Sequence, residues 1–346
     1  MISAPQELAE NVDTTPTSKQ MQYLDPDDVE STLGKHAIRI EGLSVVVYDP
    51  PQFMTHLYHW WGEIILGAWR ILSFEGGKTK ELPMPRRFLL PFSVKGAFRD
   101  PAGVNAPLMR AAWPSAQIEE SDYWEDLITL DATVVFDRVM LVNRPAAHRH
   151  HLGGQWNKMI AGTMDVTVPD NFWEPLRRTI VTNLLGHLPT PPESAREPSS
   201  KPLVTYVSRQ RANARRLLVK DHEALVSAFK DLEEQGVCEF REARMEEMSL
   251  REQVELAARS TIIIGVHGNG LTHQLWMSPS YRSAVFEIFD PEGYLFDYEI
   301  LARNMEHRHY AVWNDRLVTY PKGIYHDVRI VFLLLCQLAL AVLTFC

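Results

Sequence analysis

The second half of the chain alternates short apolar strands with helical segments, and this alternation restricts the fold more than any other feature of the sequence. Strands and helices that alternate at this length form a parallel sheet covered by helices on both faces. The pattern therefore predicts an α/β unit over residues 203–328. The expected strands are 203–207, 237–240 and 261–266, and the helices between them are 221–235 and 250–258.

The first half shows a similar alternation in a less regular form. Residues 36–48 are rich in β-branched side chains and read as a strand, and residues 53–72 read as a helix. Further along, the apolar runs at 88–90 and within 133–142 read as buried strands, separated by a helical stretch at 123–127. The first half is therefore also expected to be α/β.

Composition marks a boundary between the halves. Residues 188–202 contain five prolines together with serine and charged side chains, and they show no periodicity. Such a stretch is typical of a linker or hinge between domains. The expected organisation is a first domain at 35–187, a proline-rich linker at 188–202 and a second domain at 203–328.

The two ends of the chain differ from its body. Residues 1–34 are acidic and rich in threonine, proline, serine and glutamine, which predicts a disordered lead-in without a signal peptide or N-terminal anchor. The last segment, 329–346, is apolar from Ile330 onward except for Gln337 and Thr344. It reaches the lower limit of about 17 residues for a membrane-spanning helix. A tail anchor is one expectation, and a buried terminal helix or a stretch outside the natural coding sequence is the alternative.

Charge content argues against one class of partner, and cysteine content argues against cysteine-based crosslinks and metal sites. The 346 residues include 35 Lys and Arg against 44 Asp and Glu, a net charge of −9, so no overall positive field exists to hold a nucleic-acid backbone. The three cysteines, Cys238, Cys336 and Cys346, provide neither a disulfide framework nor a cysteine-based zinc site in the folded body. Nucleic acid is therefore not an expected partner.

The sequence STIIIGVHGNGLTHQLWM, residues 260–277, is the strongest candidate for a ligand site. An apolar strand runs into a turn with three glycines and then into a helix-like segment. Glycine lets the backbone approach a ligand closely, and the free N–H groups at a helix start favour a phosphate. A purely structural strand-to-helix turn is the alternative. The candidate ligand residues of this turn are His267, Gly268, Asn269, Gly270 and His273.

Arg209 is a second candidate because it follows the first strand of the second half. It falls at the carboxyl end of that strand, where open α/β sheets bind ligands. A guanidinium group suits a diphosphate, and the Ser208 hydroxyl lies beside it in sequence. The nearby Arg215, Arg216 and Lys220 read instead as a solvated basic face.

Glu287 is the one acid in the apolar strand AVFEIF, residues 284–289. An unpaired buried carboxylate is costly, so Glu287 is expected to accept a hydrogen bond from a donor side chain or from a ligand hydroxyl such as that of a ribose.

His59 and Glu63 are the candidate acid–base pair of the first half. On a helix their spacing puts both side chains on one face. A carboxylate beside an imidazole raises its basicity and fixes its tautomer, which prepares a general base. The aromatic residues around them, Trp60, Trp61 and Trp69, read as core more readily than as a sugar-stacking wall.

A further group of histidines, His148, His150 and His151, has a spacing that metal ligands can show. No carboxylate or cysteine lies nearby in the sequence, which favours an ordinary loop cluster, and no metal site is expected.

Several of these segments together resemble glycosyltransferase family 61. The resemblance rests on AARSTIIIGVHGNGLTHQLWM followed by AVFEIF and DYEILA, with YVSRQ and HLYHWWGE upstream, and it spans residues 56–315. Members of that family carry a strand, a GxHGAGLTH-type turn and a V-x-E-I strand. Asn269 stands where alanine is more usual, which is a small change in a tight turn.

The resemblance implies two Rossmann-like domains that face each other across a cleft, the GT-B type, with the nucleotide on the second domain. It implies inverting transfer of xylose, arabinose or N-acetylglucosamine from a UDP-sugar to a hydroxyl of a glycan or glycoprotein, without a metal or other cofactor. Arg209, Ser208 and the glycine turn would bind the leaving diphosphate. Glu287 would bind the ribose, and His59 supported by Glu63 would deprotonate the acceptor.

The resemblance also implies a location in the Golgi or endoplasmic reticulum lumen with membrane association through residues 330–346. The cytoplasm is the alternative, because no N-terminal targeting segment is expected. Two other functions remain open at this point. One is a catalytically inactive protein of the same fold that binds sugar nucleotides or glycans, and the other is a membrane-tethered interaction protein.

Overall fold

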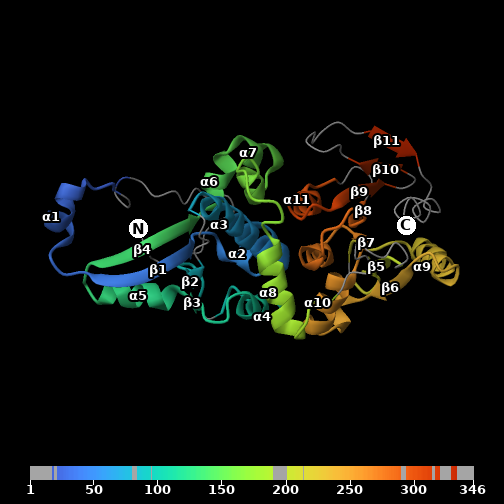
Figure 1. Ribbon diagram of the computed structural model, residues 1–346, viewed down its shortest axis with the longest axis horizontal. Helices are drawn as coiled ribbons and strands as arrows, with labels where there is room; N and C mark the ends of the chain where they lie inside the picture. The colour runs from blue at the N-terminus through green and yellow to red at the C-terminus, as the bar shows by residue number, and fades with distance from the viewer. Residues whose placement is uncertain are drawn as a thin grey trace. The chain divides into compact units, whose positions relative to one another are not determined.

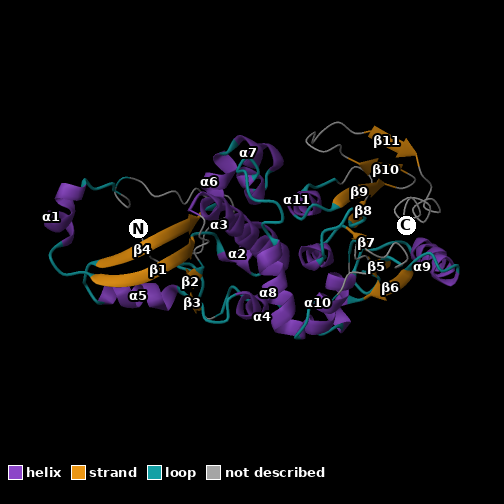
Figure 2. Ribbon diagram, viewed as in Figure 1, coloured by secondary structure: helices purple, strands orange, loops and turns teal. Residues whose placement is uncertain are grey.

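The computed structural model describes residue 18 and residues 22–79, 84–94, 96–189, 201–212, 214–289, 294–313, 316–319 and 329–332. The chain divides into two compact units, Met1–Phe172 and Trp173–Cys346. Each unit is built on its own sheet with helices around it (Figures 1 and 2). The predicted α/β class is therefore confirmed for both halves.

The first unit contains a four-stranded, fully parallel sheet in the order β3-β2-β1-β4. This order corresponds to one half of a doubly wound fold, in which the strand order reverses between β1 and β4. The elements are η1 (Pro26–Asp28), α1 (Val29–Leu33), β1 (Ile38–Val47), α2 (Pro51–Met54), η2 (Tyr58–Ile65), α3 (Leu66–Thr79), β2 (Pro85–Leu89), α4 (Asn105–Ala112), β3 (Gln117–Glu119), α5 (Ser121–Thr129), β4 (Val134–Val142), α6 (Arg144–Arg149), α7 (His151–Trp156) and η3 (Met159–Thr163).

Two expectations for this unit need correction. The apolar runs within 133–142 form the single strand β4, which is an edge strand of its sheet. Within β4 only Val142 is buried. The lead-in was expected to be disordered up to residue 34, yet η1 and α1 form within it, with the side chain of Asp25 accepting from the amide of Asp27. Residues 1–17 and 19–21 lie outside the described part of the chain.

Large aromatic side chains fill the core of the first unit. Trp60 and Trp61 are fully buried and Trp69 almost so. Trp61 stacks on Trp113 with ring centroids 6.3 Å apart, and the indole N–H of Trp69 donates to the carbonyl of Phe172. The interpretation of the three tryptophans as core is confirmed, so they form no exposed wall for a sugar.

The second unit contains a seven-stranded sheet in the order β11-β10-β9-β8-β7-β5-β6. Strands β6, β5, β7, β8 and β9 are parallel, whereas β10 and β11 are antiparallel to their neighbours. The elements are α8 (Glu174–Leu185), β5 (Leu203–Val207), α9 (Val219–Glu234), β6 (Glu239–Ala243), η4 (Met245–Glu247), α10 (Leu250–Arg259), β7 (Ile262–Val266), η5 (Asn269–Trp276), β8 (Ala284–Phe289), α11 (Asp297–Asn304), β9 (Arg308–Trp313), β10 (Arg316–Thr319) and β11 (Arg329–Phe332).

The parallel strands of the second unit are also doubly wound. Numbered in chain order they lie as 2-1-3-4-5, and the order reverses between β5 and β7. Strands β5 and β7 are buried along almost their whole length, which matches their continuous apolar sequences. Helix α10 begins with a capping box in which Ser249 and Glu252 satisfy each other's backbone amides.

The boundary between the units differs from the predicted linker. The chain divides between Phe172 and Trp173, so α8 belongs to the second unit although its residues fall in the predicted first domain. The indole N–H of Trp173 donates to the carbonyl of Leu275 at 2.9 Å, and Arg177 donates to the carbonyl of Trp276. These bonds assign α8 to the second unit, whereas proline content pointed to a boundary after this helix. Residues 190–200 of the predicted linker lie outside the described part of the chain.

The apolar C-terminal segment begins with β11 at residues 329–332, and residues 333–346 lie outside the described part. Across the residues that the structure describes, every helix is too short or too polar to cross a membrane.

Candidate functional site

The candidate residues of the second unit meet where its strand order reverses. Ligands bind open α/β sheets at the carboxyl ends of the strands beside such a reversal. Here the strands are β5 and β7, which are hydrogen-bonded neighbours, with Val207 opposite Gly265. Arg209 follows β5 and the glycine turn follows β7, so the fold brings the two predicted ligand segments together.

Arg209 lies directly against the backbone of the glycine turn. A Cβ atom added to Gly268 would lie 2.1 Å from Nη1 of Arg209, so any larger residue at this position would displace the guanidinium. The Nε of Arg209 donates to the carbonyl of Arg215 at 3.1 Å, which orients the guanidinium plane. Burial lowers the pKa of Arg209, and the charge of Arg215 adds to this effect. The result is a half-buried cation held beside the backbone of the glycine turn at a strand end.

The turn itself packs tightly onto the end of β5. A Cβ atom at Gly270 would lie 2.6 Å from Cγ1 of Val207, and one at Gly265 would lie 3.0 Å from Cδ2 of Leu271. The segment after the turn, η5, is a 3₁₀-helix rather than an α-helix. Gly265 and Gly270 therefore allow the turn to pack closely on β5 and on its own following segment.

Glu287 is completely buried, and histidines satisfy both of its carboxylate oxygens. Nδ1 of His267 lies 2.5 Å from Oε1, and Nε2 of His309 lies 2.7 Å from Oε2. Burial and the negative charges of Asp297 and Glu299 raise the pKa of Glu287 well above its ordinary value. The expected donor partners of Glu287 are thus side chains, and a ribose hydroxyl would have to displace one of the two histidines.

His309 is a residue that the sequence reasoning missed. It lies on β9, the strand beside β8, where Ala311 is opposite Glu287. Burial lowers the pKa of His309 to about 3, with a contribution from the charge of Arg303, so the ring is neutral at pH 7. The sequence does show a histidine in the next apolar strand after AVFEIF. That this histidine pairs with Glu287 could be known only once β9 was known to lie beside β8.

The other predicted ligand residues of this unit lie around the turn. His273 is buried, its Nδ1 lies 3.0 Å from the carbonyl oxygen of Gly270, and its Nε2 lies 2.9 Å from Oε1 of Gln253. Burial lowers the pKa of His273 to about 4, so it is a neutral residue that holds the turn on α10. Ser208 is also buried, and Oδ1 of Asn269 accepts a bond from Thr272. Arg215, Arg216 and Lys220 are exposed, as predicted.

The second cluster of candidate residues lies in the first unit around His59 and Glu63. Both are on η2, a π-helical stretch in which the amide of Leu66 donates to the carbonyl of Trp61. Such turns are rare and occur frequently at functional sites. Nδ1 of His59 lies 2.5 Å from Oε2 of Glu63, so the expected pair forms, although on a π-helix.

Glu63 is almost fully buried and is neutralised by Arg144. Nη1 of Arg144 donates to Oε2 at 3.0 Å, and the amide of Met159 donates to Oε1 at 3.1 Å. Burial alone would raise the pKa of the Glu63 carboxyl, but the charge of Arg144 and the hydrogen bond from His59 together hold it well below its ordinary range. Glu63 is therefore ionised and orients His59, which leaves Nε2 of His59 as the nitrogen that can take up a proton.

A second carboxylate, that of Asp49, also binds Arg144. Nη2 of Arg144 donates to Oδ2 at 2.9 Å, and Nε lies 3.1 and 3.2 Å from the two oxygens. Burial raises the pKa of Asp49, and the charge of Arg144 opposes this rise. One buried cation thus joins two buried carboxylates.

The sequence reasoning missed Asp49, Arg144 and Met159. The sequence signal for Asp49 and Arg144 was that each follows the end of an apolar strand. Val47 at the end of β1 is opposite Val142 at the end of β4, so the two residues that follow these ends lie close together. The strand order of the first unit reverses between β1 and β4, so this cluster also lies at the carboxyl ends of strands beside a reversal.

An apolar cavity of about 350 Å³ adjoins Glu63. Residues of α3, β4, α6 and η3 line it, and Glu63 is the one acid in this lining. The cavity therefore offers apolar surface beside the acid–base pair.

The chain matches a protein family, a named relative and a solved structure. The profile of the family described as Glycosyltransferase 61 matches residues 53–285, which include His59, Arg209 and the glycine turn. Over 132 residues the chain is 30% identical to the EGF domain-specific O-linked N-acetylglucosamine transferase of Drosophila melanogaster, a match that covers 37% of this chain and 23% of that protein. The chain thus spans less than a quarter of that relative. The structure of a family 9 glycosyl transferase from Veillonella parvula matches with a TM-score of 0.40 and 9% identity, over 81% of this chain and 89% of that one.

Proposed function

The chain belongs to glycosyltransferase family 61, and we propose that it is an inverting glycosyltransferase that moves a sugar from a UDP-sugar to a hydroxyl group of a glycan or glycoprotein. The observation that carries the proposal is the meeting of Arg209 with the glycine turn at the strand reversal of the second unit. The proposed reaction needs no metal or other cofactor, because protein groups neutralise the leaving group.

In the proposed reaction the second unit binds the donor. The guanidinium of Arg209 and the backbone N–H groups of Gly268, Asn269 and Gly270 would contact the diphosphate, with Ser208 beside them. As the bond between the anomeric carbon and the diphosphate oxygen breaks, negative charge develops on UDP. Preorganised cations and N–H groups stabilise such charge strongly in a site that is partly shielded from water.

Within this proposal the histidine–glutamate groups of the second unit position the donor. His267 would contact a phosphate or the sugar through Nε2, since its Nδ1 is bonded to Glu287. His309 satisfies the other oxygen of Glu287 and so fixes the orientation of the pair. His273 holds the turn and has no free ring nitrogen for the donor.

The first unit would supply the general base. Nε2 of His59 takes the proton of the acceptor hydroxyl while the acceptor oxygen attacks the anomeric carbon from the face opposite UDP. The new carbon–oxygen bond forms as the bond to UDP breaks, so the configuration at the anomeric carbon inverts. The ionised Glu63 stabilises the imidazolium of His59 that results.

Substrates and location are part of the same proposal. Xylose, arabinose and N-acetylglucosamine are the candidate sugars. The relative from Drosophila melanogaster is named as a transferase of N-acetylglucosamine to EGF domains, so UDP-N-acetylglucosamine and folded glycoprotein acceptors are the first to test. The proposed place of action is the Golgi or endoplasmic reticulum lumen.

Replacing Arg209 with alanine is expected to weaken UDP binding at least tenfold, or about 1.4 kcal/mol. The physical reason is the loss of a charge-assisted bond to the diphosphate. Isothermal titration of UDP into the full chain measures the effect. The exposed Arg216 lies on the same segment, so Arg216→Ala is the matched control and should bind UDP like the wild type. An affinity of Arg209→Ala within about threefold of the wild type would show that the assigned role is wrong.

The Gly268→Ala variant tests the contact between the turn and Arg209. The added methyl group would lie 2.1 Å from Nη1 of Arg209, so the guanidinium must move away and UDP affinity should fall about tenfold, again near 1.4 kcal/mol. Gly77→Ala is the control, because the nearest atom to its added Cβ is 3.8 Å away. Equal UDP affinity of Gly268→Ala and the wild type would mean that the observed position of Arg209 is not the one that binds UDP.

A further inference from the structure

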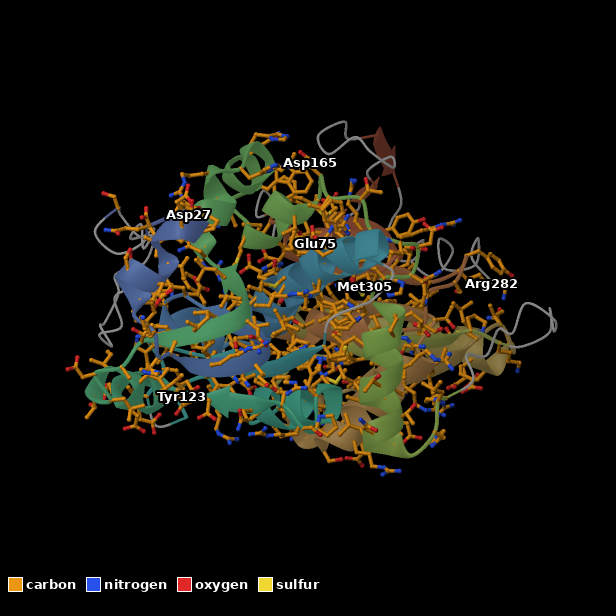
Figure 3. All side chains as sticks on the ribbon, turned by 60° about the vertical axis from the view of Figure 1, so that its left-hand side comes forward. Asp27, Glu75, Tyr123, Asp165, Arg282 and Met305 are labelled. Carbon is orange, nitrogen blue, oxygen red and sulfur yellow. The ribbon has the colours of Figure 1, made fainter. Side chains whose placement is uncertain are left out.

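Two histidines and one aspartate come together on the surface of the first unit, and none of them belongs to the proposed donor or base residues. His150 lies between α6 and α7, and His151 is the first residue of α7. Asp165, which is labelled in Figure 3, follows η3. No carboxylate stands next to these histidines in the sequence. The fold brings one to them, because Asp165, fourteen residues after His151, lies beside both rings.

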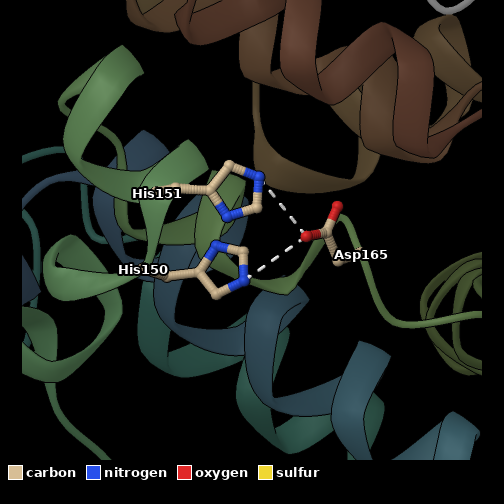
Figure 4. Close-up of side chains that lie close together, drawn as sticks. All are labelled: His150, His151 and Asp165. Atoms are coloured by element: carbon tan, nitrogen blue, oxygen red, sulfur yellow. Dashed lines mark ion pairs between the residues drawn. The ribbon is translucent and has the colours of Figure 1, made fainter.

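The three side chains direct ligand atoms toward a common space (Figure 4). Nε2 of His150 and Nε2 of His151 each lie 3.5 Å from Oδ2 of Asp165, and all the ligand atoms lie within 4.8 Å of one another. Ligands about 2.0–2.2 Å from a tetrahedral zinc ion lie roughly 3.3–3.6 Å apart. The observed separations from Asp165 therefore equal the edge of a zinc tetrahedron.

We propose that His150, His151 and Asp165 bind a divalent transition-metal ion, with Zn²⁺ as the preferred ion. Imidazole nitrogen and carboxylate oxygen are the ligand types that suit Zn²⁺, and three protein ligands leave one position for water. A simple ion pair explains the arrangement less well, because the side chains are 34–69% exposed and exposed pairs contribute only about 0–1 kcal/mol.

The metal would stabilise the segment that supports Glu63. Residues 150–165 include Met159, whose amide donates to Oε1 of Glu63. Close packing already joins this segment to α6, since a Cβ atom at Gly153 or at Gly162 would meet the carbonyl of Ala147 within 2.7 Å. A metal bound at both ends of the segment would add a second link. This proposal concerns binding and stability, and it does not rest on the proposed sugar transfer.

The first test is titration of ZnCl₂ into the metal-free full chain, without any sugar donor, followed by calorimetry. The wild type should bind one equivalent, and the variants His150→Gln, His151→Gln and Asp165→Asn should each bind at least tenfold more weakly. His36→Gln and Asp170→Asn change exposed residues of the same types in the same unit and should bind like the wild type. No binding by the wild type, or equal binding by all three cluster variants, would overturn the proposal.

Thermal unfolding provides a second readout that separates lost metal binding from lost folding. Without metal, Asp165→Asn should unfold close to the temperature of the wild type, because Asp165 is exposed. Added ZnCl₂ should raise the unfolding temperature of the wild type and of Asp170→Asn, and it should not raise that of Asp165→Asn. An equal rise in Asp165→Asn would place the bound zinc elsewhere and refute the assignment.

Discussion

Replacing His59 with alanine will lower kcat for sugar transfer by about 10²–10⁴-fold, the usual contribution of a general base, and will leave UDP affinity unchanged. The reason is local: His59 is bonded through Nδ1 to a carboxylate that Arg144 keeps ionised, and this arrangement prepares Nε2 to accept a proton. The residues proposed to bind UDP belong to the other unit. Single-turnover rates and UDP titration of the same variant separate the two effects.

The control for His59→Ala is His36→Ala, an exposed histidine of the same unit, which should transfer sugar like the wild type. Undiminished turnover of His59→Ala would assign the base to another residue, with Glu63 or Asp137 as the next candidates. Asp137 is the weaker of the two, because it already accepts from Arg39 at 2.6 Å and from the amide of Gly42 at 3.1 Å.

Replacing Arg144 with leucine will destabilise the protein by about 3–5 kcal/mol, the cost of removing one partner from buried ion pairs. Glu63 and Asp49 are 1% and 0% exposed, and both lose their cation in this variant. The midpoint of urea unfolding measures the change. Arg138, an exposed residue of β4, is the matched control, and Arg138→Leu should change stability by less than about 0.5 kcal/mol.

A combined variant distinguishes between unpaired charge and lost packing as the cause of the stability lost in Arg144→Leu. Arg144 also lies over the ring of Phe53 at 3.8 Å, so leucine removes a contact as well as a charge. Adding Asp49→Asn and Glu63→Gln to Arg144→Leu removes the two unpaired charges. Recovery of most of the lost stability is expected, whereas a combined variant no more stable than Arg144→Leu would show that packing dominates.

The sequence predicted the parts of each site that are close together in the chain. His59 and Glu63 are one helical turn apart, and the glycines of the turn follow one strand, so local spacing was sufficient to find them. Their partners come from distant elements. Arg144 reaches Glu63 from the end of β4, and His309 reaches Glu287 from β9. Strand order decides such pairs, and strand order cannot be deduced from hydrophobic periodicity.

The domain boundary shows the same limit. Proline content identifies where a chain does not form regular structure, but it does not tell which unit a neighbouring helix packs against. The bonds from Trp173 and Arg177 to the end of η5 assign α8 to the second unit. Nothing in the sequence around Trp173 or Arg177 predicts these bonds.

The most direct test of the central claim is a transfer assay with the full chain in the presence of EDTA. UDP-xylose, UDP-arabinose and UDP-N-acetylglucosamine are each offered with saccharide and glycoprotein acceptors, and both UDP release and the anomeric configuration of the product are measured. The proposed function predicts release from one donor, an inverted product, persistence in EDTA and loss in His59→Ala. Absence of release from every donor, while UDP still raises the unfolding temperature of the wild type, would contradict sugar transfer and favour a protein that only binds the nucleotide.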